Sequence, residues 1–273
     1  HDAARADRAV ADYDRVNAEG HATPREAVEN LDPYGVRRDI QGGTDNRTRV
    51  STGSLGNIPY RYIGRYEIPV SSTTISVCTG TLIGSRYVAL AAHCVYDRAD
   101  DAWILGYNSN AADYRGRFCI NGVCANVVGR KMSPDWASAG DLHFREYDYA
   151  MLKLDTTLGT TNGTMLLSSI TDDGTVKSLD ARNHGYPVDT PDGSSASATN
   201  MWGMHCDITA AYSGRLAYNC DTSGGQSGSP VYYLNDNGSY YMLAIHSGPN
   251  AFDNTGARVS NVRSWFIDGM SGW

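Results

Sequence analysis

The chain has 273 residues, of which 41% are hydrophobic and 10% aromatic, enough for a large buried core in one or two domains. No uninterrupted apolar stretch approaches the length of about 18 residues that a membrane helix needs, so we expect no membrane partner. The formal net charge is -7 and only three lysines occur, so the sequence offers no basic stripe for binding nucleic acid.

The first 39 residues differ in composition from the rest of the chain. Fifteen of them are charged, against 38 of the remaining 234. The stretch TPREAVENLDP predicts a helix, because Thr23 can act as N-cap, Pro24 occupies the first helical position and Glu26 follows three residues after the cap.

We interpret residues 1–39 as a helical N-terminal pro-segment, a partner of the chain's own body that is removed by cleavage between about Val36 and Gly42. The alternative is a permanent helical extension of the mature fold. The chain begins at His1 without an apolar signal core, which we interpret as the result of signal-peptide removal.

From Thr44 onward, short runs of β-branched and aromatic residues are separated by Gly, Asn, Asp and Ser, a pattern that predicts an all-β fold. The strongest strand candidates are TLIGSRYVALAAHC, DYAMLKL, SGSPVYY and YYMLAIHSG. NDNGS and FCINGVC predict hairpin turns, the second with Asn121-Gly122 at its tip. A helix is expected near the C-terminus, where Val259, Val262 and Phe266 recur at a spacing of three to four residues.

Six cysteines form a pattern that suits three disulfide bridges, each local in sequence. The expected pairs are Cys78 with Cys94, Cys119 with Cys124, and Cys206 with Cys220. An even number of cysteines suits an oxidising compartment, so we expect a secreted, extracellular protein.

Cysteine, histidine and aspartate residues can also bind metal ions. A zinc site formed by Cys206, Cys220 and His205 is disfavoured because the chain has no close Cys-x-x-Cys pair. Aspartates are plentiful, but no D-x-D-x-D-G loop occurs, so we expect no metal and no cofactor. Asn46, Asn162 and Asn237 are glycosylation acceptors only in a glycosylating host.

The residues for nucleophilic catalysis are all present in the β-rich body. A serine hydroxyl needs a base to remove its proton and a third group to orient that base. His93 follows an apolar strand in VALAAHC, Asp148 begins the strand DYAMLKL, and Ser227 lies in GGQSGSP. Gly225 allows a turn that directs its own N–H and that of Ser227 toward one point, an oxyanion hole. Taken singly, each residue has an ordinary explanation as a turn or packing residue.

Three motifs, CTGTLIGSRYVALAAHC, YDYAMLKL and DTSGGQSGSPVYY, together resemble chymotrypsin-like serine proteases, and specifically the bacterial glutamyl endopeptidase family, over about residues 45–268. The resemblance implies two six-stranded antiparallel β-barrels, at 40–160 and 161–273, with a cleft between them and a C-terminal helix behind. It implies that His93 is the general base, Asp148 its orienting carboxylate and Ser227 the nucleophile. The implied partners are protein or peptide substrates, and we expect a monomer.

One position departs from the digestive branch of these proteases. In trypsin-like zymogens a new N-terminal ammonium pairs with an aspartate just before the nucleophile, but here that residue is the neutral Gln226. That ion pair cannot form, even though IQGG at Ile40 resembles the start of a mature trypsin. We therefore expect the pro-segment to inhibit by blocking the cleft or by delaying folding.

Specificity depends on four residues that the resemblance assigns to substrate binding. Asp221, six residues before Ser227, matches the carboxylate with which trypsin-like enzymes bind Arg or Lys. His246 and Thr222 match the histidine and hydroxyl with which glutamyl endopeptidases bind an acidic side chain, and Ser247 follows that histidine. We favour glutamate, because an arginine would meet hydrogen-bond donors and no acceptor. The body after residue 39 contains only two glutamates against 19 aspartates, which would spare the enzyme from cutting itself.

Three alternatives stay open: an enzyme of the same mechanism with Arg/Lys specificity through Asp221, an inactive protease-fold binding protein, and an esterase of another fold. Inactive relatives usually lose a triad residue, and all three are present here. Esterases with a G-x-S-x-G elbow have the chain order Ser, Asp, His, which is the reverse of the order found here.

Overall fold

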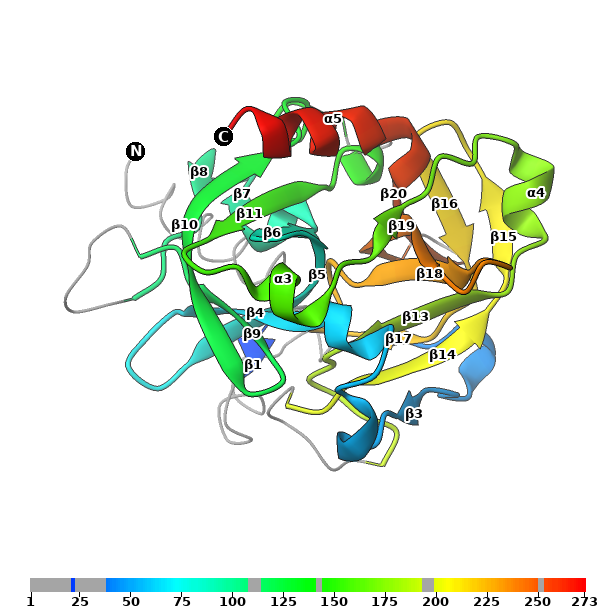
Figure 1. Ribbon diagram of the computed structural model, residues 1–273, viewed down its shortest axis with the longest axis horizontal. Helices are drawn as coiled ribbons and strands as arrows, with labels where there is room; N and C mark the ends of the chain where they lie inside the picture. The colour runs from blue at the N-terminus through cyan, green and yellow to red at the C-terminus, as the bar shows by residue number, and fades with distance from the viewer. Residues whose placement is uncertain (1–20, 23–37, 108–113, 141–143, 193–198, 250–252) are drawn as a thin grey trace.

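The computed structural model describes residues 21–22, 38–107, 114–140, 144–192, 199–249 and 253–273 (Figure 1). The helix expected from TPREAVENLDP lies outside these residues. Strands dominate the part of the chain that is described, which confirms the all-β prediction. They form two large sheets side by side, with a helix lying across both at the upper edge in Figure 1.

The first sheet is a closed barrel of six strands. In order around the barrel these are β5 (Ile75–Gly84), β4 (Ile63–Pro69), β9 (Arg117–Ile120), β10 (Val123–Met132), β11 (Ala150–Leu154) and β6 (Tyr87–Leu90). The barrel closes because β6 also pairs with β5. The short strand β1 (His21–Ala22) adds antiparallel to β5. Strands β6 and β11 are mostly apolar, and their residues Val88, Leu90 and Leu152 are fully buried in the barrel core.

The apolar run TLIGSRYVALAAHC, expected as one strand, belongs to two. β5 ends at Gly84 and β6 begins at Tyr87, so Ser85 and Arg86 form the turn of a hairpin in which Thr81 lies opposite Ala89. The run then ends in a 3₁₀ turn, η4 (Ala92–Cys94). The predicted hairpin at FCINGVC is confirmed, with Asn121 and Gly122 both at positive φ as a tight two-residue turn requires.

The second sheet is a half-barrel. Its strands, in order, are β15 (Ile208–Ala211), β16 (Arg215–Tyr218), β20 (Asn254–Arg258), β19 (Tyr240–Pro249), β18 (Pro230–Leu234), β13 (Ala181–Gly185), β14 (Trp202–Cys206) and β3 (Thr48–Arg49). β12 (Leu166–Leu167) pairs parallel with β19. The chain bends between β14 and β15 at Asp207, whose backbone N–H donates to the side-chain oxygen of Asn219. In the described residues no strand pairing joins the two ends of the sheet. The closed second barrel that the sequence predicts is therefore replaced by an open, curved sheet.

The remaining elements are short, apart from one helix. They are the strand pairs β2 (Arg38–Asp39) with β17 (Thr222–Ser223) and β7 (Tyr96–Asp97) with β8 (Ala102–Trp103), the helices α3 (Leu158–Asn162), α4 (Asp173–Lys177) and α5 (Val259–Ser271), and the 3₁₀ turns η1 (Gln41–Gly43), η2 (Thr52–Ser54), η3 (Tyr60–Tyr62) and η5 (Phe144–Glu146). No helix within the described ranges has the length and apolar character needed to cross a bilayer.

Helix α5 confirms the prediction at the C-terminus and ties the two sheets together. Val259, Val262 and Phe266 are its buried residues, as their spacing predicts. The ring of Tyr149, beside the first barrel, packs edge-on against Trp265 with centroids 5.0 Å apart. Because one face of α5 is buried against both sheets, the helix holds them in a fixed relation.

All three predicted disulfides are present: Cys78–Cys94, Cys119–Cys124 and Cys206–Cys220. The pairing leaves no free cysteine, so Cys206 and Cys220 have no thiolates to offer a zinc ion. The sulfurs of Cys78 and Cys94 lie close to His93, but they too are joined in a disulfide and do not form a metal site.

Candidate active site

Strand pairing in the barrel brings His93 and Asp148 together. β6 and β11 are antiparallel, with Leu90 opposite Ala150, so the chain leaving β6 meets the chain entering β11. His93 lies three residues beyond Leu90, and Asp148 lies two residues before Ala150. This pairing brings close together two residues that are 55 positions apart in sequence.

The two side chains make a buried hydrogen-bonded pair. Nδ1 of His93 is 2.7 Å from Oδ2 of Asp148, and the backbone N–H of His93 donates to Oδ1 at 3.0 Å. The Ser247 hydroxyl also donates to Oδ2 of Asp148. Asp148 is completely buried and His93 is 6% exposed. The carboxylate thus fixes both the ring and the backbone of the histidine.

Asp148 is ionised in this setting. Burial by itself would raise the pKa of its carboxyl group, but the charge of His93 and the hydrogen bonds from His93 and Ser247 hold the pKa below its ordinary value. An ionised carboxylate can only accept, so Nδ1 of His93 carries the hydrogen. The lone pair of the histidine is then on Nε2, the nitrogen that a general base uses.

Ser227 lies on the tight turn between β17 and β18, which the first barrel holds from behind. Thr79 of β5 donates its N–H to the carbonyl of Ser227 at 2.8 Å and its hydroxyl to the carbonyl of Gly225 at 2.8 Å. The carbonyl of Ser227 is also 3.8 Å from the sulfur of Cys94, the neighbour of His93. These contacts place the serine at the junction of the two sheets, beside the His93 turn.

The turn requires glycine at two positions. Gly225 and Gly228 have φ of +89° and +82°, a region that favours glycine. A Cβ on Gly225 would lie 2.4 Å from the carbonyl oxygen of Tyr186. The backbone of residues 225–228 therefore follows a sharp, close-packed path.

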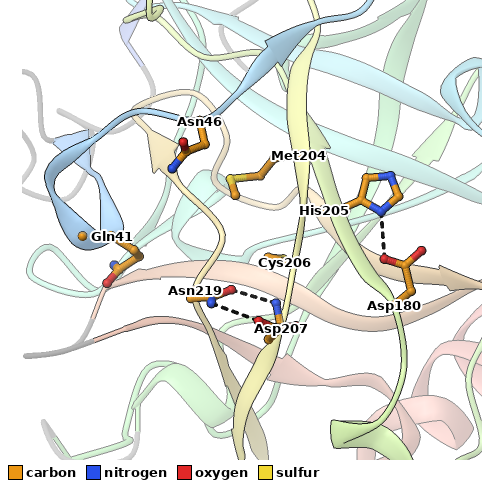
Figure 2. A pocket seen from close by; sticks show the side chains of 9 residues that line it. Gln41, Asn46, Asp180, Met204, His205, Cys206, Asp207 and Asn219 are labelled. Atoms are coloured by element: carbon orange, nitrogen blue, oxygen red, sulfur yellow. Dashed lines mark hydrogen bonds and ion pairs between the residues drawn. The ribbon is translucent and has the colours of Figure 1, made fainter.

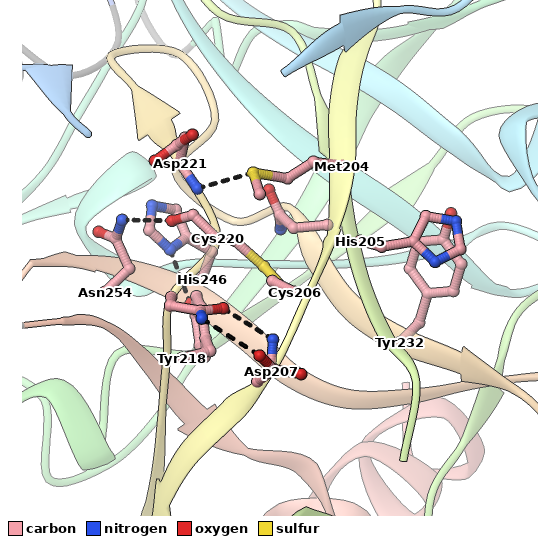
Figure 3. The surroundings of a disulfide bond; sticks show 12 residues. Met204, His205, Cys206, Asp207, Tyr218, Cys220, Asp221, Tyr232, His246 and Asn254 are labelled. Atoms are coloured by element: carbon pink, nitrogen blue, oxygen red, sulfur yellow. Dashed lines mark hydrogen bonds between the residues drawn. A yellow bond between two sulfur atoms is a disulfide. The ribbon is translucent and has the colours of Figure 1, made fainter. Parts of the chain in front are cut away.

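The residues predicted to bind substrate differ in what they contact, and Figure 3 shows two of them, His246 and Asp221. Nδ1 of His246 is 2.7 Å from the hydroxyl of Tyr218 on β16. Burial, helped by the charges of Arg145 and His93, lowers the pKa of His246 to about 3, so its ring is neutral at pH 7. The hydroxyl of Thr222 is buried and has no hydrogen-bond partner among the described residues.

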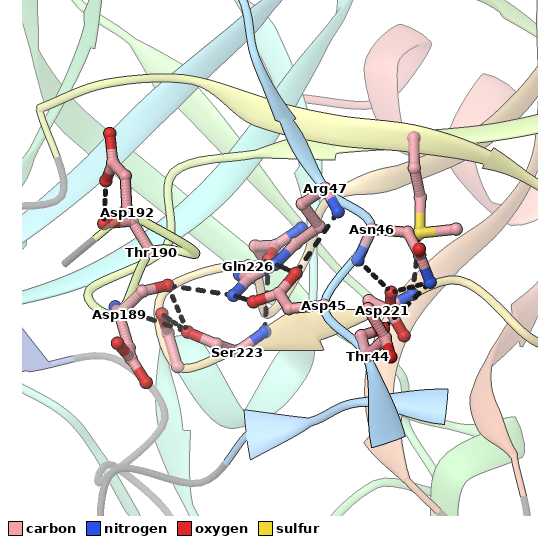
Figure 4. Close-up of polar contacts among 12 residues, drawn as sticks. Thr44, Asp45, Asn46, Arg47, Asp189, Thr190, Asp192, Asp221, Ser223 and Gln226 are labelled. Atoms are coloured by element: carbon pink, nitrogen blue, oxygen red, sulfur yellow. Dashed lines mark hydrogen bonds and ion pairs between the residues drawn. The ribbon is translucent and has the colours of Figure 1, made fainter. Parts of the chain in front are cut away.

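The side chain of Asp221 faces Asn46, near the start of the described body of the chain (Figure 4). Its Oδ1 accepts from the backbone N–H of Gln41 at 2.7 Å, and its Oδ2 accepts from the backbone N–H of Asn46 at 2.7 Å and from the Asn46 side chain at 3.2 Å. We call residues 38–50 the N-terminal arm. The carboxylate of Asp221 is thus bound to this arm, and the hydroxyl of Ser247 is bound to Asp148.

Sequence reasoning missed three residues that hold the site: Thr79, Tyr218 and Arg47. Each acts through contacts to residues more than 25 positions away, so no local pattern marks it. Thr79 is next to Cys78 in the first quoted motif, the one signal that could have singled it out.

A polar cavity of about 530 Å³ lies between the N-terminal arm and β14 (Figure 2). Gln41 and Asn46 line one side, and His205, which pairs with Asp180 at 2.8 Å, lies on another. Neither His93 nor Ser227 lines this cavity. The cavity is therefore separate from the candidate catalytic residues and borders the N-terminal arm, to which Asp221 is hydrogen-bonded.

Comparisons with known proteins agree with this geometry. Residues 56–266 match the Trypsin family. The chain is 31% identical over 224 residues to the Extracellular metalloprotease of Bacillus subtilis, covering 80% of this chain and 66% of that protein. It is 29% identical over 248 residues to the Glutamyl endopeptidase of Bacillus licheniformis, covering 88% of this chain and 70% of that protein. This chain thus spans about two thirds of the length of these relatives.

Among solved structures, a Glu endopeptidase in complex with MPD has the same fold. The TM-score is 0.65 at 24% sequence identity, and the match covers 85% of this chain and 99% of the other. Since the family match takes in the strands that carry His93, Asp148 and Ser227, the chain belongs to the trypsin family of serine proteases.

Proposed function

We propose that the protein is a secreted serine endopeptidase that cleaves peptide bonds after acidic residues, with glutamate preferred. The observation that carries the catalytic part is the buried pair of His93 and Asp148, because it fixes Nε2 of the histidine as a base. Three disulfides and the name of the B. subtilis relative support an extracellular location.

In the proposed reaction, Nε2 of His93 takes the proton from the Ser227 hydroxyl as Oγ attacks the substrate carbonyl. The backbone N–H groups of Gly225 and Ser227 donate to the oxyanion that forms. His93 then gives the proton to the leaving amine, and an acyl-enzyme remains on Ser227. A water molecule, deprotonated by the same nitrogen, releases the acid product and restores the serine.

Glutamate specificity rests on Thr222 and His246. The Thr222 hydroxyl is a buried donor without a partner in the described protein, and such a group gains most from a ligand that accepts its hydrogen bond. When the Tyr218 hydroxyl donates to Nδ1 of His246, Nε2 carries a hydrogen and can donate as well. Two donors and a buried site suit a carboxylate, whereas the trypsin-like alternative lacks its acceptor, because Asp221 is bound to the arm.

The matched test compares chromogenic peptides that end in Glu, Asp, Arg or Phe. The Glu peptide should be cleaved fastest, and His246→Ala should reduce its lead. Ser227→Ala should lose turnover by a factor on the order of 10⁶. Faster cleavage of the Arg peptide would support trypsin-like specificity. Failure of the wild-type protein to react with a fluorophosphonate at Ser227 would support a binding protein that has lost catalysis.

The pro-segment is also part of the proposal. Residues 1–39 are proposed to be released by a cut between about Val36 and Gly42, and N-terminal sequencing of the active form tests this. Fully active enzyme that still begins at His1 would contradict it. The division of the body into 40–160 and 161–273 likewise stays a proposal, and β3 of the N-terminal arm adds to the second sheet rather than to the first.

A further inference from the structure

Gln226, the residue before the nucleophile, is fully buried, and both ends of its side-chain amide are hydrogen-bonded. Its Oε1 accepts from Nη1 of Arg47 at 2.7 Å and from the N–H of Ser223 at 3.1 Å. Its Nε2 donates to Oδ1 of Asn183 at 3.0 Å. A guanidinium group can only donate, so Arg47 determines which end of the amide faces it.

The cation is an internal part of the N-terminal arm. The Arg47 side chain has no exposed surface, and Asp45 neutralises it through two contacts, Nε to Oδ1 at 2.9 Å and Nη2 to Oδ2 at 2.6 Å. Nη2 also donates to the carbonyl of Asp189 at 3.0 Å. Figure 4 shows the guanidinium between Asp45, Asp189 and Gln226. Burying a charge is costly unless it is paired, so this arrangement holds Arg47 in one position.

Arg47 thereby contacts two segments that adjoin Gly225, the residue proposed to donate to the oxyanion. Asp189, one of its partners, directly follows Val188, whose N–H donates to the carbonyl of Gly224 at 2.7 Å. In a trans peptide the C=O and the N–H point in opposite directions, so this bond turns the N–H of Gly225 away from Val188. Gln226, the other partner, is the residue that follows Gly225. The guanidinium of Arg47 therefore holds Asp189, next to the residue that orients the Gly224–Gly225 peptide. It also holds Gln226, which follows that peptide in the chain.

We propose that Arg47 is a positioning residue for the oxyanion hole. It supplies from within the chain the cation that, in trypsin-like enzymes, a new N-terminal ammonium supplies next to the nucleophile. Because Arg47 is an internal residue, this contact needs no cleavage between Val36 and Gly42. The inference rests on the proposed serine-protease reaction, in which the N–H of Gly225 stabilises the oxyanion.

The test uses Arg47→Met together with Asp45→Asn, so that the half-buried carboxylate of Asp45 does not lose its ion-pair partner. Loss of one oxyanion donor lowers turnover by about 10²- to 10³-fold, and we expect kcat to fall toward that range while KM changes little. Binding of a peptide aldehyde ending in glutamate, whose adduct with Ser227 places an oxygen in the hole, should weaken by a similar factor. The matched control is Arg49→Met on the same N-terminal arm, since Arg49 is exposed, contacts Asn200 and should leave both values unchanged.

A variant at Gln226 tests the same contact if the Arg47 variant does not fold. Gln226→Met removes the acceptor and leaves Arg47 paired with Asp45, and this variant should show the same fall in kcat. Gln226→Glu keeps an acceptor for Arg47 and should retain most of the wild-type kcat. Combining Gln226→Met with the Arg47 change should cost little more than either alone, because both remove one contact. Wild-type kcat and aldehyde affinity in the folded Arg47 or Gln226→Met variant would overturn the inference.

The inference can fail separately from the proposed function. If wild-type protein hydrolyses no peptide, the proposed function is wrong, and amide hydrogen exchange over residues 222–230 still tests Arg47. Exchange there should be faster in the Arg47 variant than in wild type and unchanged in Arg49→Met. Equal protection in all three proteins would overturn the positioning role.

Discussion

The carboxylate of Asp221 accepts a hydrogen bond of 2.7 Å from the backbone N–H of Gln41, 180 residues earlier in the chain. The same carboxylate binds Asn46, so a residue that resembles a trypsin specificity determinant holds the N-terminal arm. β2 and β17 pair next to it, with Asp39 opposite Thr222. The segment that contains Asp221 and Thr222 is therefore joined to the N-terminal arm.

Asp221→Asn should weaken the attachment of the N-terminal arm, and so lower the stability of the protein, without changing substrate preference. The amide has one acceptor oxygen where the carboxylate has two, so one backbone N–H loses its partner, and the free energy of unfolding should fall by about 1–3 kcal/mol. Urea unfolding and the four chromogenic peptides measure the two effects. Asp207→Asn, on the exposed corner between β14 and β15, is the control. An Arg preference that exists in wild type and vanishes in Asp221→Asn would contradict this role.

Thr222→Val should reduce cleavage after glutamate while leaving the fold intact. Valine has nearly the same shape, and the hydroxyl it lacks has no partner in the described protein. A hydrogen bond to a charged group contributes about 1.5–3 kcal/mol, so kcat/KM for the Glu peptide should fall roughly tenfold to a hundredfold. The Phe peptide should be affected far less. Thr222→Ser, which keeps the hydroxyl, should stay close to wild type, and equal losses on Glu and Phe peptides would argue against a carboxylate contact.

Gly225→Ala should disable catalysis, whereas Gly238→Ala should not. Both glycines have a left-handed backbone conformation, with φ of +89° and +80°, so an alanine causes similar backbone strain at either position. Only at Gly225 does the new Cβ meet a fixed atom, the carbonyl oxygen of Tyr186 at 2.4 Å, while at Gly238 nothing lies within 4 Å. The loop at 225 must shift, and kcat should fall by about 10² or more if the oxyanion hole is displaced. Comparable kcat values in the two variants, after active-site titration, would show that the loop tolerates the shift.

Stability should fall as the pH is lowered from about 6.5 toward 3, because of two buried histidines. Burial lowers the pKa of His184 and of His246 to about 3 each, below the ordinary value of 6.5. Between these values the unfolded chain binds protons that the folded chain does not, so each histidine contributes a loss of about 1.4 kcal/mol per pH unit. Urea unfolding across this range measures the slope. His184→Gln or His246→Gln should make the slope shallower at acid pH, and a slope unchanged in both would contradict this origin.

Much of the fold and of the candidate active site could be predicted from the sequence because it depends on local patterns. The hairpin at Asn121-Gly122, the helix that buries Val259 and Val262, and the disulfide pairs close in sequence follow from turn chemistry, periodicity and spacing. The three residues of the proposed triad could be named because each lies at the end of a recognisable strand or in a glycine turn, and the family match covers them.

The tertiary structure decided the contacts that no local pattern encodes. The open second sheet depends on a bend at Asp207, and the orientation of Asp221, the Tyr218–His246 bond and the Arg47–Gln226 contact all join residues far apart in sequence. A carboxylate or a guanidinium has the same chemistry wherever it stands, and the partner that folding brings to it determines whether it binds substrate or holds the chain. Strand register, set by burial of whole apolar faces, selects those partners, so the roles of Asp221 and Arg47 emerge only when both sheets are assembled.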